Sequence, residues 1–127
     1  MRAFIDSDVL ICHLRGERKA RSFLRRLRDK RDYDLWIGAL QRAEVVFFMR
    51  PEEEEQTFLF LSQFQTASVD QSIVDNAGAL FRRWNPSHGI DVNDAFLAAT
   101  AKRTGGRIFT LNKKHYPMPD LLISQAW

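Results

Sequence analysis

The chain of 127 residues contains one cysteine, Cys12, and no group of Cys and His residues with the spacing of a zinc site. A single cysteine cannot close an internal disulfide, so a disulfide-stapled scaffold and a zinc finger are both excluded. No apolar run approaches the roughly 18–20 residues that a membrane span requires. The N-terminus reaches Asp6 and Asp8 too early for a signal peptide. These absences predict a soluble, cytoplasmic protein that makes no membrane contact.

The length and the charge distribution narrow the possibilities further. A chain of 127 residues predicts one domain, spanning residues 1–127, with enough buried surface to fold without a metal. The net charge is +3, but residues 15–31 hold nine Arg and Lys against two acids. A basic element of net +7 on a body of net −4 suggests a polyanionic partner at one face. A solvated helix face is the alternative that charge alone leaves open.

Short apolar segments alternate with amphipathic ones along the chain. Strands are predicted at residues 2–5 (with Val9, Leu10 and Ile11 grouped with this strand), 35–38, 66–69, 107–110 and 121–124. Helices are predicted at 15–31, 39–49, 51–64, from Asp70 or Ser72 to Trp84, and at 91–104, with a loop at 85–89. This alternation predicts an α/β domain with a short, mostly parallel sheet of four to five strands flanked by helices.

Several acidic side chains fall where ligands bind in such folds, beyond the carboxyl ends of the strands. Asp6 follows the first strand directly, and Asn112 follows the strand at 107–110. Asp91 and Asp94 open a helix three residues apart, so both can lie on one face. Glu44 lies in an otherwise apolar helical segment, where an unpaired carboxylate is costly.

Each of these acids also has a purely structural interpretation. Asp91 or Asp94 could be a helix N-cap, Asp6 a turn residue, and Glu44 the partner of an arginine. As a set they favour function, because carboxylates brought to one sheet edge repel one another without a counter-ion. Hard cations such as Mg²⁺ or Mn²⁺ prefer such oxygen ligands.

Four segments resemble the PIN-domain ribonuclease family, in particular the VapC-type toxins of bacterial toxin–antitoxin pairs. They are Phe4–Ile11, Ala43-Glu44-Val45, Asp94–Ala101 and Ile108–Tyr116. The more specific segments are Asp-Ala-x-x-Ala-Ala-Thr-Ala, from Asp94, and Thr-Leu-Asn-x-x-His-aromatic, from Thr110. The segments occur in the order that the family has and cover nearly the whole chain, so the resemblance implies a PIN-like nuclease domain over residues 1–127.

The resemblance implies an acidic site for Mg²⁺ or Mn²⁺, with Asp6, Glu44 and Asp94 as metal ligands and catalytic residues. Asn112 stands at a fourth catalytic position, where the family often has Asp, and as a neutral donor it is suited to orienting a phosphate or water. Asp91 could supply the missing negative charge, and Asp8 could hold the metal ligands in position without binding the metal itself. The implied reaction is metal-assisted hydrolysis of RNA phosphodiester bonds, with water as the nucleophile.

The resemblance also implies partners. The segment 15–31, Arg82-Arg83 and Lys113–His115 would hold the RNA backbone. Members usually form homodimers and are neutralised by a small antitoxin protein that covers the active-site groove. Apolar surface for either interface could come from four phenylalanines, although burial in the core is the commoner fate of this residue. They are Phe47, Phe48, Phe58 and Phe60.

Two other functions remain open at the level of sequence. A catalytically degenerate PIN-like module could bind RNA or protein without cleaving, and Asn112 is the feature that favours it. A haloacid-dehalogenase-like phosphatase is the second, because Asp6-Ser7-Asp8 and residues 89–94 resemble two of its motifs. That resemblance is imperfect at Leu10, and it leaves Glu44 unexplained.

Overall fold

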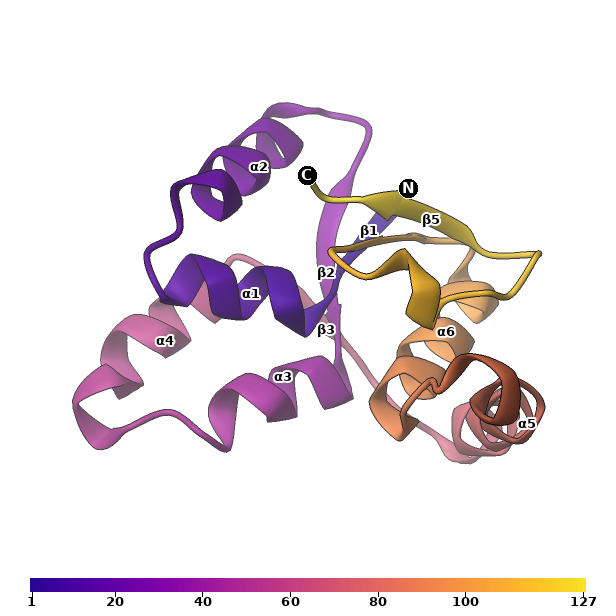
Figure 1. Cartoon of the computed structure of the whole chain (residues 1–127). Coiled ribbons are helices and arrows are strands. Elements are labelled where there is room, and N and C mark those ends of the chain that lie inside the picture. The colour runs from indigo at the N-terminus through magenta and orange to yellow at the C-terminus, as the bar shows by residue number, and fades with distance from the viewer.

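A computed structural model describes all residues, 1–127, as five strands and six α-helices with two short 3₁₀ turns (Figure 1). The strands are β1 (Arg2–Ile5), β2 (Asp34–Gly38), β3 (Gln65–Ala67), β4 (Arg107–Thr110) and β5 (Leu122–Gln125). The helices are α1 (Ser7–Leu14), α2 (Arg18–Asp29), α3 (Ala39–Val46), α4 (Glu54–Leu61), α5 (Gln71–His88) and α6 (Val92–Thr104). The 3₁₀ turns are η1 (Pro51–Glu53) and η2 (Lys113–His115).

The five strands form one sheet in the order β3-β2-β1-β4-β5, and every neighbouring pair is parallel. The predicted α/β class and strand number are therefore confirmed. The chain builds outward from β1 through β2 to β3, and then restarts on the other side of β1 with β4. Such a reversal opens a crevice at the carboxyl ends of the two central strands, which is where this class of fold binds ligands.

The helices cover both faces of the sheet, as Figure 1 shows with α1, α2 and α4 on one side and α5 and α6 on the other. Ala3 and Ile5 of β1 face the first group, together with Leu10 and Leu24. Phe4, between them, faces the second group. This alternation is the expected two-residue period of a strand buried on both faces. No helix is both long and apolar enough to cross a membrane.

The first segment differs from the prediction, because Val9, Leu10 and Ile11 lie in α1 and do not extend the first strand. Asp6 ends β1 in an extended conformation, and its carboxylate accepts a hydrogen bond from the Ser7 N–H at 2.8 Å. This N-cap starts a helix immediately after the strand. Val9, Leu10 and Ile11 are compatible with a strand or a helix, and the N-cap at Asp6 favours the helix.

The predicted loop at 85–89 is also wrong, because α5 continues through Pro86 to His88. A proline in the last turn removes only one intrahelical hydrogen bond. Gly89 then ends the helix with φ +63°, and its N–H donates to the Asn85 carbonyl at 2.9 Å. The Asn85 side chain donates to the Ile90 carbonyl at 2.9 Å, which fixes the exit of the chain.

The helix predicted to end near Met49 stops at Val46. Phe47 and Phe48 therefore lie beyond the helix and not in its buried face. Phe47 and Phe48 are 78% and 82% exposed, and Phe58 lies at the surface as well. Only Phe60 is buried, with its ring stacked on His13 at a centroid distance of 4.2 Å. Burial in the core, expected for most of these residues, is therefore wrong for three of them.

Candidate active site

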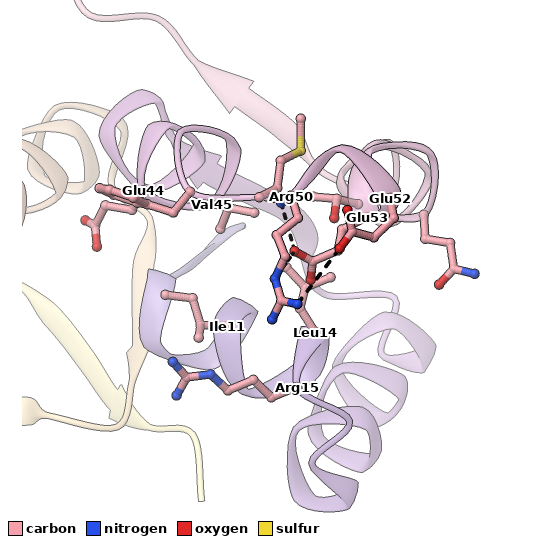
Figure 2. Close-up of a pocket in the computed structure, with 12 residues that line it drawn as sticks. Ile11, Leu14, Arg15, Glu44, Val45, Arg50, Glu52 and Glu53 are labelled. Carbon is pink, nitrogen blue, oxygen red and sulfur yellow. Dashed lines mark hydrogen bonds and ion pairs between the residues drawn. The ribbon is translucent and has the colours of Figure 1, made fainter.

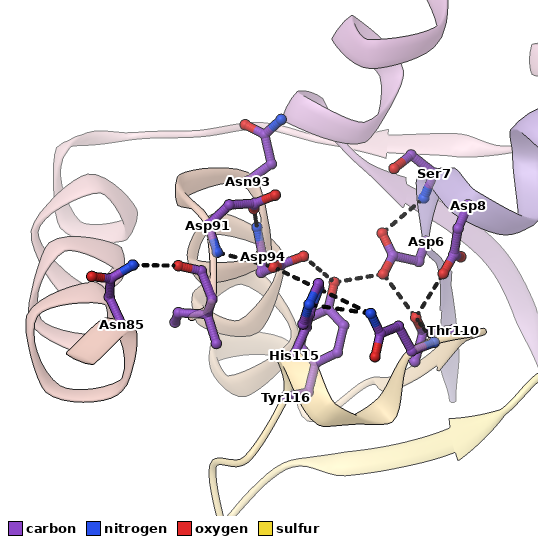
Figure 3. Close-up of polar contacts among 12 residues, drawn as sticks. Asp6, Ser7, Asp8, Asn85, Asp91, Asn93, Asp94, Thr110, His115 and Tyr116 are labelled. Atoms are coloured by element: carbon purple, nitrogen blue, oxygen red, sulfur yellow. Dashed lines mark hydrogen bonds and ion pairs between the residues drawn. The ribbon is translucent and has the colours of Figure 1, made fainter. Parts of the chain in front are cut away.

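The predicted acids meet where the sheet topology reverses, at the carboxyl ends of β1 and β4. Asp6 follows β1 directly, and Asp94 lies in the first turn of α6. The hydroxyl of Tyr116 bridges them, donating to Asp6 Oδ2 at 2.7 Å with Asp94 Oδ1 at 3.4 Å (Figure 3). The structure thus brings together two acids that are 88 residues apart in the sequence.

Asp6 is as enclosed as Asp94, with only 7% of the surface of each residue exposed. Besides the bond from its neighbour's N–H, Asp6 Oδ2 accepts hydrogen bonds from the hydroxyls of Thr110, at 3.0 Å, and Tyr116. Burial, together with the nearby charge of Asp8, raises the pKa of Asp6 to about 6. The three hydrogen-bond donors lower the pKa of Asp6 only in part. An ionised carboxylate at this position is therefore stable only with a positively charged partner.

Asp94 is held by a reciprocal capping box at the start of α6. The Asp94 N–H donates to Asp91 Oδ1 at 2.7 Å, and the Asp91 N–H donates to Asp94 Oδ2 at 3.1 Å. Burial raises the pKa of Asp94 to about 7, and the charges of Asp91 and Asp6 act in the same direction. His115 Nδ1 lies 3.2 Å from Asp94 Oδ2 and can pair with it when protonated.

Glu44 lies beside this pair of acids but does not touch either of them. Its Oε2 accepts a hydrogen bond from the Ser7 hydroxyl at 2.8 Å, and its Oε1 accepts one from the Asn93 amide at 2.8 Å. Ser7 therefore binds Glu44 through its hydroxyl and Asp6 through its N–H. The alternative of an arginine partner is wrong, because these two neutral donors satisfy the carboxylate.

Asn112 lies at the edge of the site, on the turn after β4. Its N–H donates to the Thr110 hydroxyl oxygen at 3.0 Å, and its amide nitrogen lies 3.1 Å from His115 Nε2. Its side chain makes no hydrogen bond to the three predicted carboxylates, and His115 stands between it and Asp94. A role for Asn112 in catalysis stays a prediction.

The two further acids support the site by holding its elements together. The Asp8 carboxylate accepts hydrogen bonds from the Thr110 hydroxyl at 3.1 Å and the Leu111 N–H at 3.0 Å, which ties α1 to the end of β4. Asp91 is the N-cap of α6, as its structural interpretation predicts. Its negative charge nevertheless acts on Asp94.

Four polar residues of this network were not singled out from the sequence as site residues. They are Ser7, Asn93, Thr110 and Tyr116. Each one is a neutral hydrogen-bond donor, and such residues carry no distinctive signal until the acids they serve are placed in space. Of the four, Tyr116 could have been found from the sequence, because it is the last residue of the segment Ile108–Tyr116 that resembles the family.

The donor chemistry of the site fits a hard divalent cation. Asp6 and Asp94 are buried, repel each other, and offer oxygen ligands only. As the side chains stand, no three His, Cys, Asp or Glu residues are close enough together to ligate one ion. Asp6 and Asp94 are thus the pair suited to hold the cation, and Glu44 adds negative charge beside them.

A groove of about 600 Å³ leads away from Glu44 between α1, α3 and α4 (Figure 2). Its walls include Ile11 and Leu14 of α1 and the exposed Phe48. Arg50, on the opposite wall, lies 3.7 Å from the carboxylate of Glu53. One end of a groove lined by both apolar and charged side chains therefore opens next to an acid of the site.

Comparisons with known proteins agree with this arrangement. The sequence matches the PIN domain family over residues 3–121. It is 37% identical over 119 residues to Ribonuclease VapC10 of Mycobacterium tuberculosis, covering 93% of this chain and 88% of the relative. It is 34% identical to Ribonuclease VapC19 of the same organism, covering 92% and 94%. The chain therefore belongs to the PIN domain family, among the VapC proteins.

Solved structures share the fold along the whole chain. VapBC-1 from nontypeable Haemophilus influenzae superposes with a TM-score of 0.79 at 18% identity, covering 99% of this chain and 98% of that one. A toxin–antitoxin complex from Klebsiella pneumoniae gives 0.78 at 22% identity, covering 98% of both chains. The family resemblance found in the sequence is confirmed, and nothing is left to favour a haloacid-dehalogenase-like phosphatase.

Proposed function

We propose that this protein is a metal-dependent endoribonuclease and the toxin of a toxin–antitoxin pair. The observation that carries the proposal is the buried pair Asp6 and Asp94, bridged by one tyrosine hydroxyl at the switch point of the sheet. A structural acid pair would be expected to face a basic partner. Here the donors are neutral, apart from a histidine beside Asp94, and the two negative charges call for a cation. The VapC relatives named as ribonucleases make RNA the favoured substrate.

Asp6 and Asp94 would hold Mg²⁺ or Mn²⁺, and Glu44, which is hydrogen-bonded to Ser7, would add negative charge nearby. When bound, the cation supplies Lewis-acid chemistry that favours ionisation of a water and neutralises charge on the phosphate. Water is the proposed nucleophile, and no protein side chain competes with it: the only cysteine is not among the residues of this network, and no serine there is paired with a histidine and an acid.

The side chains of the protein have distinct tasks in this reaction. Thr110 and Tyr116 hold the Asp6 carboxylate in one orientation through two hydroxyl donors. The capping box fixes Asp94. Asn112 and His115, on the turn beside Asp94, are placed to donate hydrogen bonds to the phosphate oxygens of the RNA.

The protein partner is an antitoxin that occupies the groove beside Glu44. The solved neighbours include toxin–antitoxin complexes, and the groove offers both apolar side chains, such as Ile11 and Phe48, and charged ones, such as Arg15. A polypeptide lying there would cover Glu44 and obstruct access to the acids. The exposed Phe47, next to the groove, provides apolar surface for a homodimer, because exposed aromatic pairs commonly mark an interface.

The test is cleavage of total cellular RNA by the purified protein, free of antitoxin, in Mg²⁺ or Mn²⁺. Discrete fragments are expected with the cation and none in EDTA. Asp94→Asn should lower the rate at least about a hundredfold while leaving the fold intact, because it removes charge from the buried pair. The matched control is Asp75→Asn, an exposed acid of α5 outside the site, which should cleave like the wild type.

The opposite result would favour a PIN-like module that binds without cleaving. That alternative rests on Asn112, the neutral residue at the fourth position. It predicts RNA binding with no cleavage in either cation, and equal binding by the wild type and Asp94→Asn. Cleavage that persists in EDTA would contradict both interpretations.

A further inference from the structure

A second pocket, of about 170 Å³, lies on the basic helix α2, outside the acidic site. Three arginines of α2 form one wall: Arg21, Arg25 and Arg28. Their spacing of four and three residues places them along one face of the helix. The volume is close to the roughly 150 Å³ of a cavity that accepts one benzene ring, so the pocket has room for one aromatic group.

The opposite wall of this pocket is apolar and rigid. Leu24 of α2 and Leu35 of β2 contribute to it. The rings of Phe60 and Phe64 pack edge to face at a centroid distance of 5.3 Å, and His13 stacks flat on Phe60. The three arginines therefore share the pocket with a hydrophobic floor that is already fixed by packing within the core.

The positive charge of the three arginines is not neutralised within the protein. No acid lines the pocket, and none of the three forms an ion pair. Arg28 makes only a 3.4 Å hydrogen bond to the Gln63 side chain. Burial lowers the pKa of His13, and the positive charge of Arg21 acts in the same direction.

Helix α1 connects this pocket with the acidic site. Ser7, at the start of α1, binds Glu44 and Asp6, whereas His13, six residues later, lines the pocket. A rise of about 1.5 Å per residue separates the two positions by about 9 Å along the helix axis.

We infer that Arg21, Arg25 and Arg28 form an anchoring site for single-stranded RNA, which holds the strand outside the acidic site. This inference rests on the proposed RNA substrate and names the surface that holds it. The guanidinium groups bind phosphates bidentately, and the pocket accepts one unpaired base against its apolar floor. Single-stranded nucleic acid is commonly bound by this combination of a basic wall and an aromatic or apolar platform.

An acidic polypeptide is the other partner that three arginines could attract. RNA is favoured, because the pocket is a compact space for one ring rather than a groove long enough for a helix. The pocket also combines an apolar floor with arginines, which suits a base attached to a charged backbone. An acidic segment would satisfy the charges but would leave the floor without a matching group.

The experiment measures binding of a fluorescein-labelled single-stranded RNA of mixed sequence by fluorescence anisotropy over a range of salt concentrations. Asp94→Asn is the background for all variants, so that the RNA is not cleaved. The test variant replaces Arg21, Arg25 and Arg28 by Gln. The control replaces Arg50, Lys102 and Arg103 by Gln, which removes the same number of positive charges from exposed positions outside the segment 15–31 and outside the pocket. Circular dichroism melts check that the variants are folded.

The test variant should bind RNA at least about tenfold more weakly, and its slope of log K against log salt should fall by about two, since three phosphate contacts each contribute about 0.7. The control should lose at most about threefold. A third variant with Lys at the three positions should keep the slope but lose affinity, because lysine cannot bind phosphate bidentately.

Equal losses in the test and control variants would overturn the inference, because general charge would then explain the binding. Full affinity in the test variant would also overturn it. Tight binding of poly-glutamate that depends on the three arginines, with no such dependence for RNA, would assign the pocket to an acidic protein instead. Cleavage by the wild type is measured separately, so failure of the nuclease proposal would show as RNA binding without cleavage.

Discussion

Tyr116 is the residue on which the geometry of the two central acids depends. Its hydroxyl donates to Asp6 and lies within 3.4 Å of Asp94. Tyr116→Phe should lower RNA cleavage by about tenfold, in the range expected when one positioned hydrogen bond near charge is lost. The control is Tyr33→Phe, because the Tyr33 ring packs on Phe109 and its hydroxyl makes no hydrogen bond within the protein. Equal activity of both variants and the wild type would contradict this role.

The same pair of acids predicts an unusual dependence of stability on pH. The pKa values of Asp6, about 6, and Asp94, about 7, lie above the ordinary value of 3.8. Between pH 3.8 and about 7, the folded protein therefore binds more protons than the unfolded chain. As pH rises through this range, the contribution of both carboxyl groups to the free energy of unfolding falls.

Thermal melts in EDTA test this dependence. Asp6→Asn should melt several degrees higher than the wild type at about pH 8, and at the same temperature or lower at about pH 4, because only the ionised carboxyl is costly. Adding Mg²⁺ should stabilise the wild type at about pH 8 and narrow the difference. A difference between the two proteins that does not change with pH would contradict the electrostatic explanation.

Individual residues show where sequence reasoning succeeds and where it stops. Asp6 and Asp94 could be predicted to meet, because one follows a strand and the other opens a helix at the same sheet edge. The position of Glu44 beside them was also expected, but its partners Ser7 and Asn93 were not. Those partners depend on how α1, α3 and α6 pack against one another, and no local pattern encodes that packing.

At the scale of elements, the start of α6 is both a helix cap and part of the site. Asp91→Ala should lower the free energy of unfolding by about 1 kcal/mol, because it removes an N-cap. It should also reduce cleavage, since Asp94 loses the partner of its N–H. Asp91→Asn keeps a capping oxygen, so most stability should remain. Urea titrations together with RNA cleavage measure both effects, and unchanged stability in the alanine variant would rule out the cap.

Element boundaries were the less predictable part of the fold. Short apolar runs such as Val9-Leu10-Ile11 suit a strand or a helix, and the Asp6 cap, visible only in three dimensions, decided for α1. Pro86 was taken to mark a loop, although a proline in a last turn costs only one hydrogen bond. The alternation of strands and helices, by contrast, was sufficient to predict a parallel sheet.

At the scale of the whole molecule, Phe47 and Phe48 lie on the surface, whereas Phe60 lies in the core. Changing both to Ser should leave the melting temperature almost unchanged, because their side chains are mostly exposed. It should also shift sedimentation toward the monomer, because Phe47 is the residue proposed for the dimer surface. Phe60→Ser is the contrasting variant, which should cost about 3–5 kcal/mol because Phe60 is buried. A large loss of stability in the double variant would contradict this assignment.

The chemistry of the RNA ends tests the proposed reaction most directly. If water attacks the phosphate at the Asp6–Asp94 site, cleavage in Mg²⁺ or Mn²⁺ should leave linear phosphate and hydroxyl ends only. Attack by the RNA's own 2′-hydroxyl, which requires no carboxylate-held cation, would instead leave 2′,3′-cyclic phosphate. Mass spectrometry of the fragments distinguishes the two. Linear ends that vanish in EDTA are expected, whereas cyclic phosphate ends formed equally in EDTA would contradict the central claim.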